Sequence, residues 1–207
     1  MLSPTVPTSQ LVDDACAKFD IDNKLAEGAL EELFRQYPEN KDPKHVLLKV
    51  VAVNTLYRTN IFAVEGVAAH ISQNVSDLDP ALQSGDAEIV ERISKIRVGN
   101  AGREFNFFSF SSKFCSWHNP ESFPIYDARV ENYLWTLQKQ RRFSDLLNHR
   151  SDLWSYPRFR QIISDLRDAF DLQTYSFKKI DKFMYTYGDL STSTELNSSQ
   201  PTLPSAE

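Results

Sequence analysis

The sequence predicts an all-α protein, built as one compact multi-helix domain. Apolar residues recur at the three- and four-residue spacing of a helix through most of the 207-residue chain. Short β-branched runs, such as residues 50–53, lie inside these helical patterns, so a central sheet is not expected. The length suits one sizeable core and is short for two ordinary domains. We therefore expect more than half of the residues in helix and no sheet larger than a two-stranded hairpin.

The first half of the chain has the start and stop signals of four helices. Asn23 is a suitable N-cap, and Pro38 ends the pattern that follows it. Asp42 and Pro43 then have the arrangement of an N-cap followed by proline in the first turn. The helix that begins there contains few polar residues, so we expect it to be buried on most sides. The four helices are predicted at residues 23–37, 43–57, 60–73 and 87–97.

The second half begins with a turn at Gly99 and Gly102 and continues with an aromatic-rich helix that ends before Pro120. Pro124 opens the next helix, and two more follow. These helices are predicted at residues 105–117, 124–137, 157–170 and 177–187. We expect a flexible N-terminus over residues 1–9, a single helical domain over residues 10–189, and a disordered tail over residues 190–207, whose polar composition cannot offset the entropy of ordering.

The composition narrows the classes of function. The formal net charge is −5, from 23 basic and 28 acidic residues, which counts against a large non-specific DNA footprint. Cys16 and Cys115 cannot form a four-cysteine zinc or iron–sulfur site, so no metal and no cofactor are expected. Neither a membrane-spanning run nor a leader peptide is found, and we expect a cytoplasmic protein that contacts no membrane. The sequence does not indicate the oligomeric state.

Lys113 and Asp127 form the pair with the clearest chemistry. Lys113 lies on the aromatic helix, and Asp127 opens the next helix after a proline-bounded loop. A lysine in an apolar cleft has its charged form disfavoured, which lowers its pKa and frees the amine as a nucleophile. An aspartate at a helix N-terminus is held ionised by the helix dipole and the free N–H groups. Two helices joined by a tight turn would bring the two groups to one cleft.

This segment resembles the catalytic stretch of the helix-hairpin-helix DNA glycosylases of the endonuclease III and 8-oxoguanine glycosylase type. Residues 124–130 are similar to the family's hydrophobic-Asp step, and Lys113 is similar in placement to its nucleophile. Residues 42–60 resemble the family's buried helix and the turn after it. The resemblance implies a DNA glycosylase, with or without lyase activity, that flips a modified or damaged base out of DNA and excises it. Lys113 and Asp127 would be catalytic; the substrate-binding residues would be Asn54, Tyr57, Arg58, Trp117, His118 and Arg129.

The departures from the family pattern keep other functions open. The stretch before the lysine, residues 108–112, has no glycine, whereas the family's hairpin is glycine-rich and binds a DNA phosphate. The loop between Lys113 and Asp127 is about one helical turn shorter than usual in the family. A non-catalytic module that binds nucleic acid or a protein is the alternative. A third reading is a helical scaffold in which Lys113 and Asp127 form a buried ion pair.

Each candidate residue also has a purely structural interpretation. Lys113 could extend along an amphipathic helix, and Asp127 could be an ordinary N-terminal acid. His118 suits a helix C-cap, and Cys115 suits an apolar filler. Asn54 belongs either to a core polar network or to a pocket. The tryptophans suit the core better than base stacking; they are Trp117, Trp135 and Trp154.

The catalytic interpretation requires two geometric features. The Lys113 ammonium and the Asp127 carboxylate should lie within about 8 Å of each other at the mouth of one cleft. The cleft should also have a positive rim, because a DNA partner needs its phosphates neutralised. The expected contributors are Arg58, Arg103, Arg129, Lys178, Lys179 and Lys182.

Overall fold

The computed structural model describes residues 4–74, 77–98 and 103–188. Within these residues, ten α-helices and one 3₁₀ segment surround a continuous apolar core, and the strands form a single two-stranded antiparallel hairpin. More than half of the chain is helical. The prediction of a compact all-α domain is confirmed. In the described part of the chain, none of the helices has the length and apolar character needed to cross a bilayer.

The elements follow one another along the chain with short connections. They are α1 (Ser9–Asp22), α2 (Lys24–Gln36), α3 (Pro43–Tyr57), α4 (Val64–Asn74), α5 (Leu78–Ser84), α6 (Glu88–Ser94), β1 (Lys95–Val98), β2 (Arg103–Asn106), α7 (Phe108–His118), α8 (Ala128–Gln140), the 3₁₀ segment η1 (Arg150–Trp154), α9 (Tyr156–Ala169) and α10 (Phe177–Tyr187). In the hairpin, Lys95 pairs with Asn106 and Val98 with Arg103.

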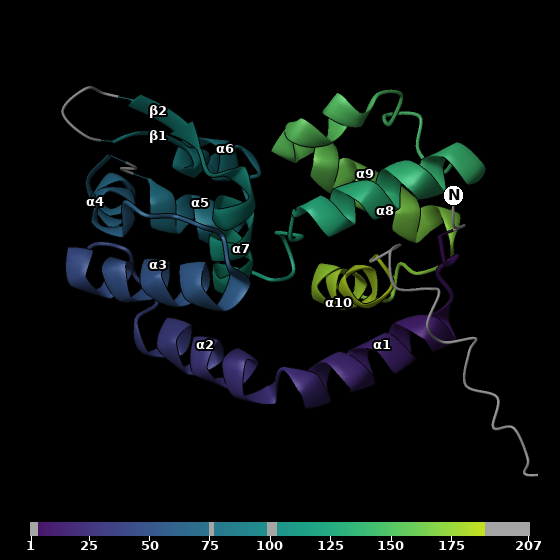
Figure 1. Ribbon diagram of the computed structural model, residues 1–207, viewed down its shortest axis with the longest axis horizontal. Coiled ribbons are helices and arrows are strands. Elements are labelled where there is room, and N and C mark those ends of the chain that lie inside the picture. The colour runs from purple at the N-terminus through teal and green to yellow at the C-terminus, as the bar shows by residue number, and fades with distance from the viewer. Residues whose placement is uncertain (1–3, 75–76, 99–102, 189–207) are drawn as a thin grey trace, which may run out of the picture.

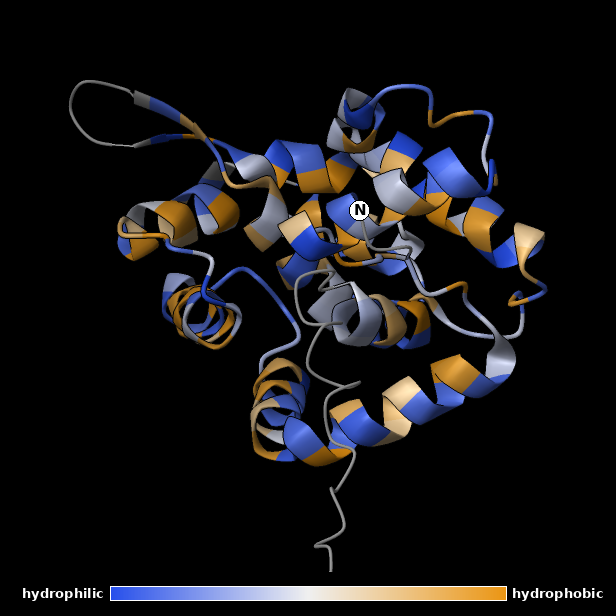
Figure 2. Cartoon of the chain, turned by 45° about the vertical axis from the view of Figure 1, so that its right-hand side comes forward, coloured by the Kyte–Doolittle hydropathy of each residue, from blue (hydrophilic) through white to orange (hydrophobic). Residues whose placement is uncertain are grey.

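The helices gather in two groups, as Figure 1 shows. Helices α3 to α7 and the hairpin form one group, and α8, α9 and α10 form the other. Helices α1 and α2 run past both, with α1 against α10 and α2 against α3 and α7. Apolar and polar residues alternate around these helices (Figure 2), which is the pattern of helices that bury one face. The arrangement leaves α7, α8 and α10 meeting at the junction of the groups.

Helix α3 begins as predicted but is less buried than expected. The Asp42 side chain accepts a hydrogen bond from the Lys44 N–H at 2.9 Å, and Pro43 occupies the first turn. One face packs into the core through Val46, Val50 and Val53. Leu48, Val51 and Leu56 are exposed, because no element covers that face of α3 in the described structure. The prediction of burial on most sides is wrong.

The N-terminal region is more ordered than the sequence pattern indicates. Helix α1 was not among the expected helices, since it buries only the narrow stripe of Val12 and Ala15. Pro4 and Pro7 are buried before it, and the Tyr133 hydroxyl donates to the Thr5 carbonyl at 2.8 Å. Residues 4–7 of the stretch expected to be flexible thus contact the rest of the domain, and residues 1–3 lie outside the described part.

Asn23 also has another role than the one expected. Its side chain makes no N-cap hydrogen bond to α2. Its amide instead donates to the Phe19 carbonyl at 3.0 Å and closes α1. The boundary between α1 and α2 is therefore set by a C-terminal cap, and Asn23 is the residue that connects the two helices.

Several predicted boundaries in the middle of the chain shift. Helix α4 starts later than residue 60, because Arg58 and Asn60 take left-handed backbone angles, with φ of 52° and 59°. The helix expected over residues 87–97 ends at Ser94, where the backbone turns into β1. Trp154, expected in the core, is 61% exposed. The turn at Gly99 and Gly102 and the tail over residues 190–207 lie outside the described residues.

Candidate functional site

A cavity of about 540 Å³ lies where the two groups of helices meet. It contains both predicted catalytic residues, Lys113 and Asp127, and three of the predicted substrate-binding residues, Tyr57, Arg58 and Arg129. The other lining residues come from α1, α2, α3, α8, α10 and the connections at Asn23 and Ile125; they are Phe19, Asn23, Ala26, Glu27, Leu30, Leu56, Ile125, Ala128, Val130, Lys178, Asp181, Lys182 and Tyr185. We call this cavity the cleft.

Lys113 reaches the cleft from the buried face of α7. Its side chain is only 4% exposed. The ammonium donates to the Ser109 hydroxyl at 2.7 Å and to the Tyr126 carbonyl at 3.1 Å, and it lies 5.6 Å from the centre of the Tyr57 ring. Burial lowers the pKa of Lys113, although the carboxylates of Asp127 and Asp181 oppose this effect. The structure thus favours the neutral amine more than water would.

Asp127 is the N-cap of α8. One carboxylate oxygen, Oδ1, accepts the backbone N–H groups of Arg129 and Val130, both at 2.9 Å. The other oxygen, Oδ2, lies 3.9 Å from the Lys113 ammonium, well inside the separation expected from the sequence. The side chain is 26% exposed. Asp127 therefore caps α8 with one oxygen and holds the other beside the lysine.

Hydrogen bonds from three side chains hold the loop between Lys113 and Asp127. The Ser112 hydroxyl accepts the Tyr126 N–H at 3.0 Å, and Asp181 accepts the Ile125 N–H at 2.9 Å. The Tyr156 hydroxyl donates to the Pro124 carbonyl at 2.7 Å. These bonds fix the carbonyl that binds Lys113 and fix the start of α8. The short loop therefore places Lys113 and Asp127 together.

Asp181 is a further acidic residue in the cleft, which the sequence reasoning missed. It is 6% exposed, and Oδ2 accepts the Ile125 N–H. Its other oxygen, Oδ1, has no hydrogen-bond partner among the described residues. Burial raises the pKa of Asp181 well above its usual value, despite that bond from Ile125. An acid within the apolar stripe of α10, beside Phe177, Ile180 and Met184, was the available signal.

The rim of the cleft is mixed in charge. Arg58 is exposed, and the Arg129 guanidinium lies 5.0 Å from the centre of the Tyr185 ring. Lys178 pairs with Glu27 at 2.8 Å, and Lys182 pairs with Asp20. The predicted positive rim is therefore reduced at both lysines. Of the remaining expected contributors, Lys179 lies away from the cleft, 5.4 Å from the centre of the Tyr175 ring, and the side chain of Arg103 is outside the described residues.

Asn54 and Tyr57 have different roles at the end of α3. The Asn54 side chain accepts the Thr59 hydroxyl at 2.8 Å and the Ile61 N–H at 2.9 Å, and donates to the Ile61 carbonyl at 2.9 Å. These bonds fasten the loop after α3, and Asn54 does not line the cleft. Of its two interpretations, the structure favours the polar network. Tyr57 does line the cleft, and burial raises its pKa.

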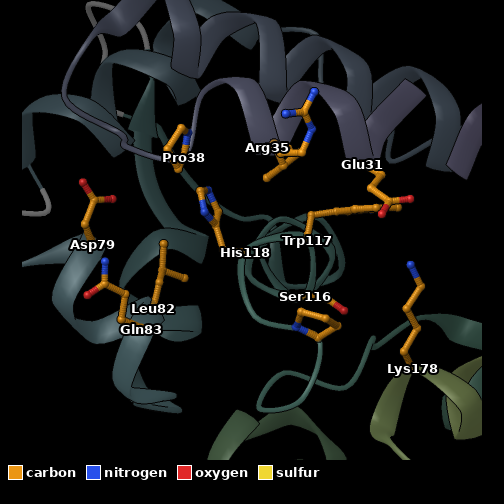
Figure 3. A pocket seen from close by; sticks show the side chains of 12 residues that line it. Glu31, Arg35, Pro38, Asp79, Leu82, Gln83, Ser116, Trp117, His118 and Lys178 are labelled. Atoms are coloured by element: carbon orange, nitrogen blue, oxygen red, sulfur yellow. The ribbon is translucent and has the colours of Figure 1, made fainter. Parts of the chain in front are cut away.

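Trp117 and His118 line a neighbouring cavity of about 460 Å³, seen in Figure 3, and not the cleft. Lys178 belongs to both cavities, and its ammonium lies 4.2 Å from the centre of the Trp117 ring. The Trp117 indole N–H donates to the Tyr57 hydroxyl at 3.1 Å. Trp117 therefore forms part of the wall between the two cavities. It supports Tyr57 from behind.

His118 lies against a second buried lysine. Its Nε2 is 3.4 Å from the Lys49 ammonium, and burial together with that charge lowers the pKa of His118 well below 6.5. The expected capping role is wrong, because the C-cap of α7 is Asn119, whose N–H donates to the Cys115 carbonyl at 2.9 Å. Cys115 itself is fully buried, as the filler interpretation predicts.

Lys49 was not singled out by the sequence analysis. It is 0% exposed and donates to the Tyr37 carbonyl at 3.0 Å, the Glu39 carbonyl at 3.1 Å and the Asn40 side chain at 2.6 Å. Burial lowers the pKa of Lys49 to about 8, against the opposing effect of Asp79. Since Lys49 satisfies fixed oxygens and lines neither cavity, it stabilises the fold near His118.

Comparison with known proteins identifies relatives by sequence. The chain is 38% identical over 143 residues to an uncharacterized protein of Haemophilus influenzae, and the match covers 69% of this chain and 66% of that protein. The chain thus spans slightly less than two thirds of that relative's length. No solved structure matches. A family model described as the HI_0787 N-terminal domain matches residues 11–122, a stretch that includes Lys113 and ends before Asp127 and Asp181. The chain belongs to the HI_0787 N-terminal domain family.

Proposed function

We propose that this protein excises a modified or damaged base from DNA, with Lys113 as the nucleophile. One observation carries the proposal: a buried lysine, a helix-capping carboxylate 3.9 Å from it, and a cavity of about 540 Å³ occur together. A cavity of this size has room for a flipped nucleobase. The resemblance of residues 42–60 and 107–130 to the helix-hairpin-helix glycosylases supports the same chemistry.

The proposed reaction uses each side chain for one task. The neutral Lys113 amine attacks the sugar carbon C1′ as the bond from C1′ to the base breaks, and the electron pair of that bond leaves with the base. Positive charge develops on the sugar in this step, and the Asp127 carboxylate stabilises it. Ser109 and the Tyr126 carbonyl hold the amine in place, since both accept hydrogen bonds from it.

DNA would approach the open side of the cleft past Arg58 and Arg129. Residues 108–112 have no glycine, and a β-hairpin in place of a tight turn joins α6 to α7, so the phosphate contact of the glycosylase hairpin is not expected here. With few phosphate contacts, the affinity would depend on salt with a shallow slope.

The test is covalent trapping with borohydride on DNA that carries an abasic site. The C1′ aldehyde condenses with the Lys113 amine, water leaves, and borohydride reduces the imine to a stable amine. We expect trapping by the wild type and none by Lys113→Gln. Asp127→Asn, which keeps an oxygen for the cap, should reduce base excision by several orders of magnitude. Lys49→Gln is the matched control, because it removes an equally buried lysine outside the cleft and should still trap below its melting temperature.

A non-catalytic binding module or scaffold is the second candidate, and a specific observation favours it. Lys113 already has two hydrogen-bond acceptors and an ion-pair partner, as a structural lysine would. In that case Lys113→Gln would leave buried groups unpaired and reduce the free energy of unfolding by about 3–5 kcal/mol. A wild-type protein that does not trap, together with such a loss, would support this candidate and exclude the glycosylase.

A further inference from the structure

We propose that Asp181 is the general acid of the cleft, which gives a proton to the base as it leaves. The inference rests on the proposed function, and it adds a third residue and a class of substrate. The observation behind it is a carboxyl group on the wall of the cleft, 6% exposed, with one oxygen bonded to a backbone N–H and the other unpartnered among the described residues.

The bond from Ile125 decides where the proton of Asp181 resides. Oδ2 accepts the Ile125 N–H, so it carries no proton in that bond. A proton on Asp181 therefore sits on Oδ1, the oxygen that has no partner within the described structure. A buried carboxylate oxygen without a donor is costly, whereas a neutral carboxyl group in the same place needs only an acceptor. Oδ1 is itself buried, so a nucleobase that enters the cleft has to displace the side chains over it before a ring nitrogen or a carbonyl oxygen supplies that acceptor.

The two aspartates of the cleft have different surroundings. Asp127 accepts two backbone N–H groups at a helix N-terminus and is a quarter exposed. Asp181 is buried, and burial is the main cause of its raised pKa. Environments that separate two carboxyl groups in this way assign one as the acid and the other as the charged partner. In this assignment Asp127 stabilises the positive charge on the sugar, and Asp181 gives a proton to the leaving base.

Both protons that move in the proposed step are transferred to or from Asp181 in the cleft. As the bond between C1′ and the base breaks, the electron pair stays on the base nitrogen and Asp181 Oδ1 gives its proton to the base, which leaves as a neutral molecule. Asp181 is then a carboxylate. The amine that has attacked C1′ carries one proton more than a neutral secondary amine, and Asp181 takes that proton. Lys113 and Asp181 shift each other's pKa in the free protein, as neighbouring charges do.

This assignment selects a class of substrate. An acid is needed for a base that is neutral in DNA and would leave as a poorly stabilised anion, such as a deaminated or oxidised base. A base alkylated to a cation leaves as a neutral molecule without a proton, so it gains little. The cleft is therefore assigned to neutral lesions.

The experiment separates the two steps with one variant. Wild type, Asp181→Asn and Lys113→Gln are assayed on duplexes that each carry one hypoxanthine, uracil, 8-oxoguanine or 7-methylguanine, and on an abasic duplex. Asp181→Asn keeps an oxygen for Ile125 but has no acidic proton. We expect it to trap on abasic DNA within about twofold of wild type and to excise a neutral lesion about 10²–10⁴-fold more slowly, the usual contribution of a general acid. Any excision of 7-methylguanine should change little.

Ser112→Ala is the matched structural control, because it removes another of the side-chain hydrogen bonds that hold the same loop. A residue that only positions the loop would reduce trapping and excision together, and that result for Asp181→Asn would overturn the proposal. Unchanged excision of the neutral lesion, or a wild type that traps but excises none of the four bases, would overturn it as well. A wild type that fails to trap would instead overturn the proposed function.

The wild type offers a second measurement that needs no variant. The ratio of excision rate to trapping rate should fall as pH rises, because excision of a neutral lesion uses the proton of Asp181, whereas trapping on abasic DNA has no leaving base that needs this proton. The charged and titratable groups that act on Asp181 are Lys113 on α7, Asp127 before α8, Lys178 on α10 and the phenols of Tyr57 and Tyr156. A ratio that is constant or rises with pH would contradict the assignment.

Discussion

Lys49 and Lys113 are both buried, yet their surroundings differ in one respect that matters for chemistry. The three hydrogens of the Lys49 ammonium meet three fixed oxygens, so none is left for a ligand. Lys113 has two such partners and, at 3.9 Å, the Asp127 carboxylate, and it lines a cavity. A nucleophile needs a lone pair that can face its substrate. Only the second arrangement provides one.

The titration of Lys113 can be measured directly. Its pKa should lie below 10.5, because burial disfavours the ammonium. NMR of the lysine side chains should show the Lys113 transition below that value, with the exposed Lys41 as an internal reference. In Asp127→Asn the transition should move lower still, since the carboxylate that favours the charged form is gone. A transition of Lys113 at or above 10.5 would contradict the burial argument.

At the scale of residues, the sequence predicted the pair and missed its neighbours. Lys113 and Asp127 were found because a motif marks them, and a short loop leaves few ways to place them. Asp181 is more than fifty positions away from that loop, and its bond to Ile125 arises only when α10 packs on α8. Periodicity cannot show such a contact. A polar residue within an apolar stripe was the only warning, for Asp181 and for Lys49.

Among the elements, the end of α3 shows how a helix terminus shapes the cleft. Arg58 is the C-cap and has a left-handed backbone, with φ of 52°, at a position that normally favours glycine. The Asn54 side chain then fastens the loop through Thr59 and Ile61. An arginine kept in this conformation costs stability and brings a cation to the cleft rim. The loop is thus rigid where the charge is needed.

Arg58→Gly should separate these two effects. Glycine adopts the left-handed conformation without strain, so the free energy of unfolding should rise by about 1 kcal/mol. The affinity for DNA should fall, because a rim charge is lost. Arg58→Ala is the control, since it removes the charge and keeps the strained backbone; it should lose affinity without the gain in stability. Urea unfolding and a fluorescence binding assay measure the two quantities. A less stable glycine variant would refute the strain argument.

The helices that the sequence placed correctly are those with local signals. Asp42 with Pro43 marks the start of α3 by a cap that needs only nearby residues. Asp127 caps α8 in the same way, but that helix was expected from Pro124 and begins only at Ala128. The end of α6 was misplaced, because Ile96 continues the apolar spacing while its backbone pairs with Phe105 in the hairpin. Pairing between strands depends on residues that the helical pattern does not include.

For the whole molecule, the polar centre around His118 links several elements of the first group of helices. His118 on α7 contacts Lys49 on α3, which binds Asn40, and Asn40 in turn donates to Asp79 of α5 at 2.6 Å. The pKa of His118 in the folded chain lies well below 6.5, mainly because of burial. The unfolded chain therefore binds a proton near pH 6 that the folded chain does not. This difference makes stability depend on pH.

The direction of that dependence follows from linkage. Below pH 6.5 the unfolded state gains the proton, so the free energy of unfolding should fall as pH falls, by up to about 1.4 kcal/mol per pH unit from this residue. Above that range His118 contributes no slope. Urea unfolding between pH 5 and 7.5 should show the loss in the wild type and in the partly exposed His45→Gln, and a smaller slope in His118→Gln. Equal slopes in all three proteins would contradict the role of His118.

The partnership of α1 and α10 has a consequence for how the protein is made. Residues 9–22 leave the ribosome long before residues 177–187 exist, so α1 stays without its main neighbour until α10 has been made. Because the buried stripe of α1 is narrow, the helix exposes little apolar surface to water during this time. When α10 arrives, Phe19 meets Tyr185 edge to face at 5.4 Å, and both rings become part of the wall around Lys113. A nascent chain that ends before α10 therefore lacks a closed cleft, and any activity there begins only after α10 has been synthesised.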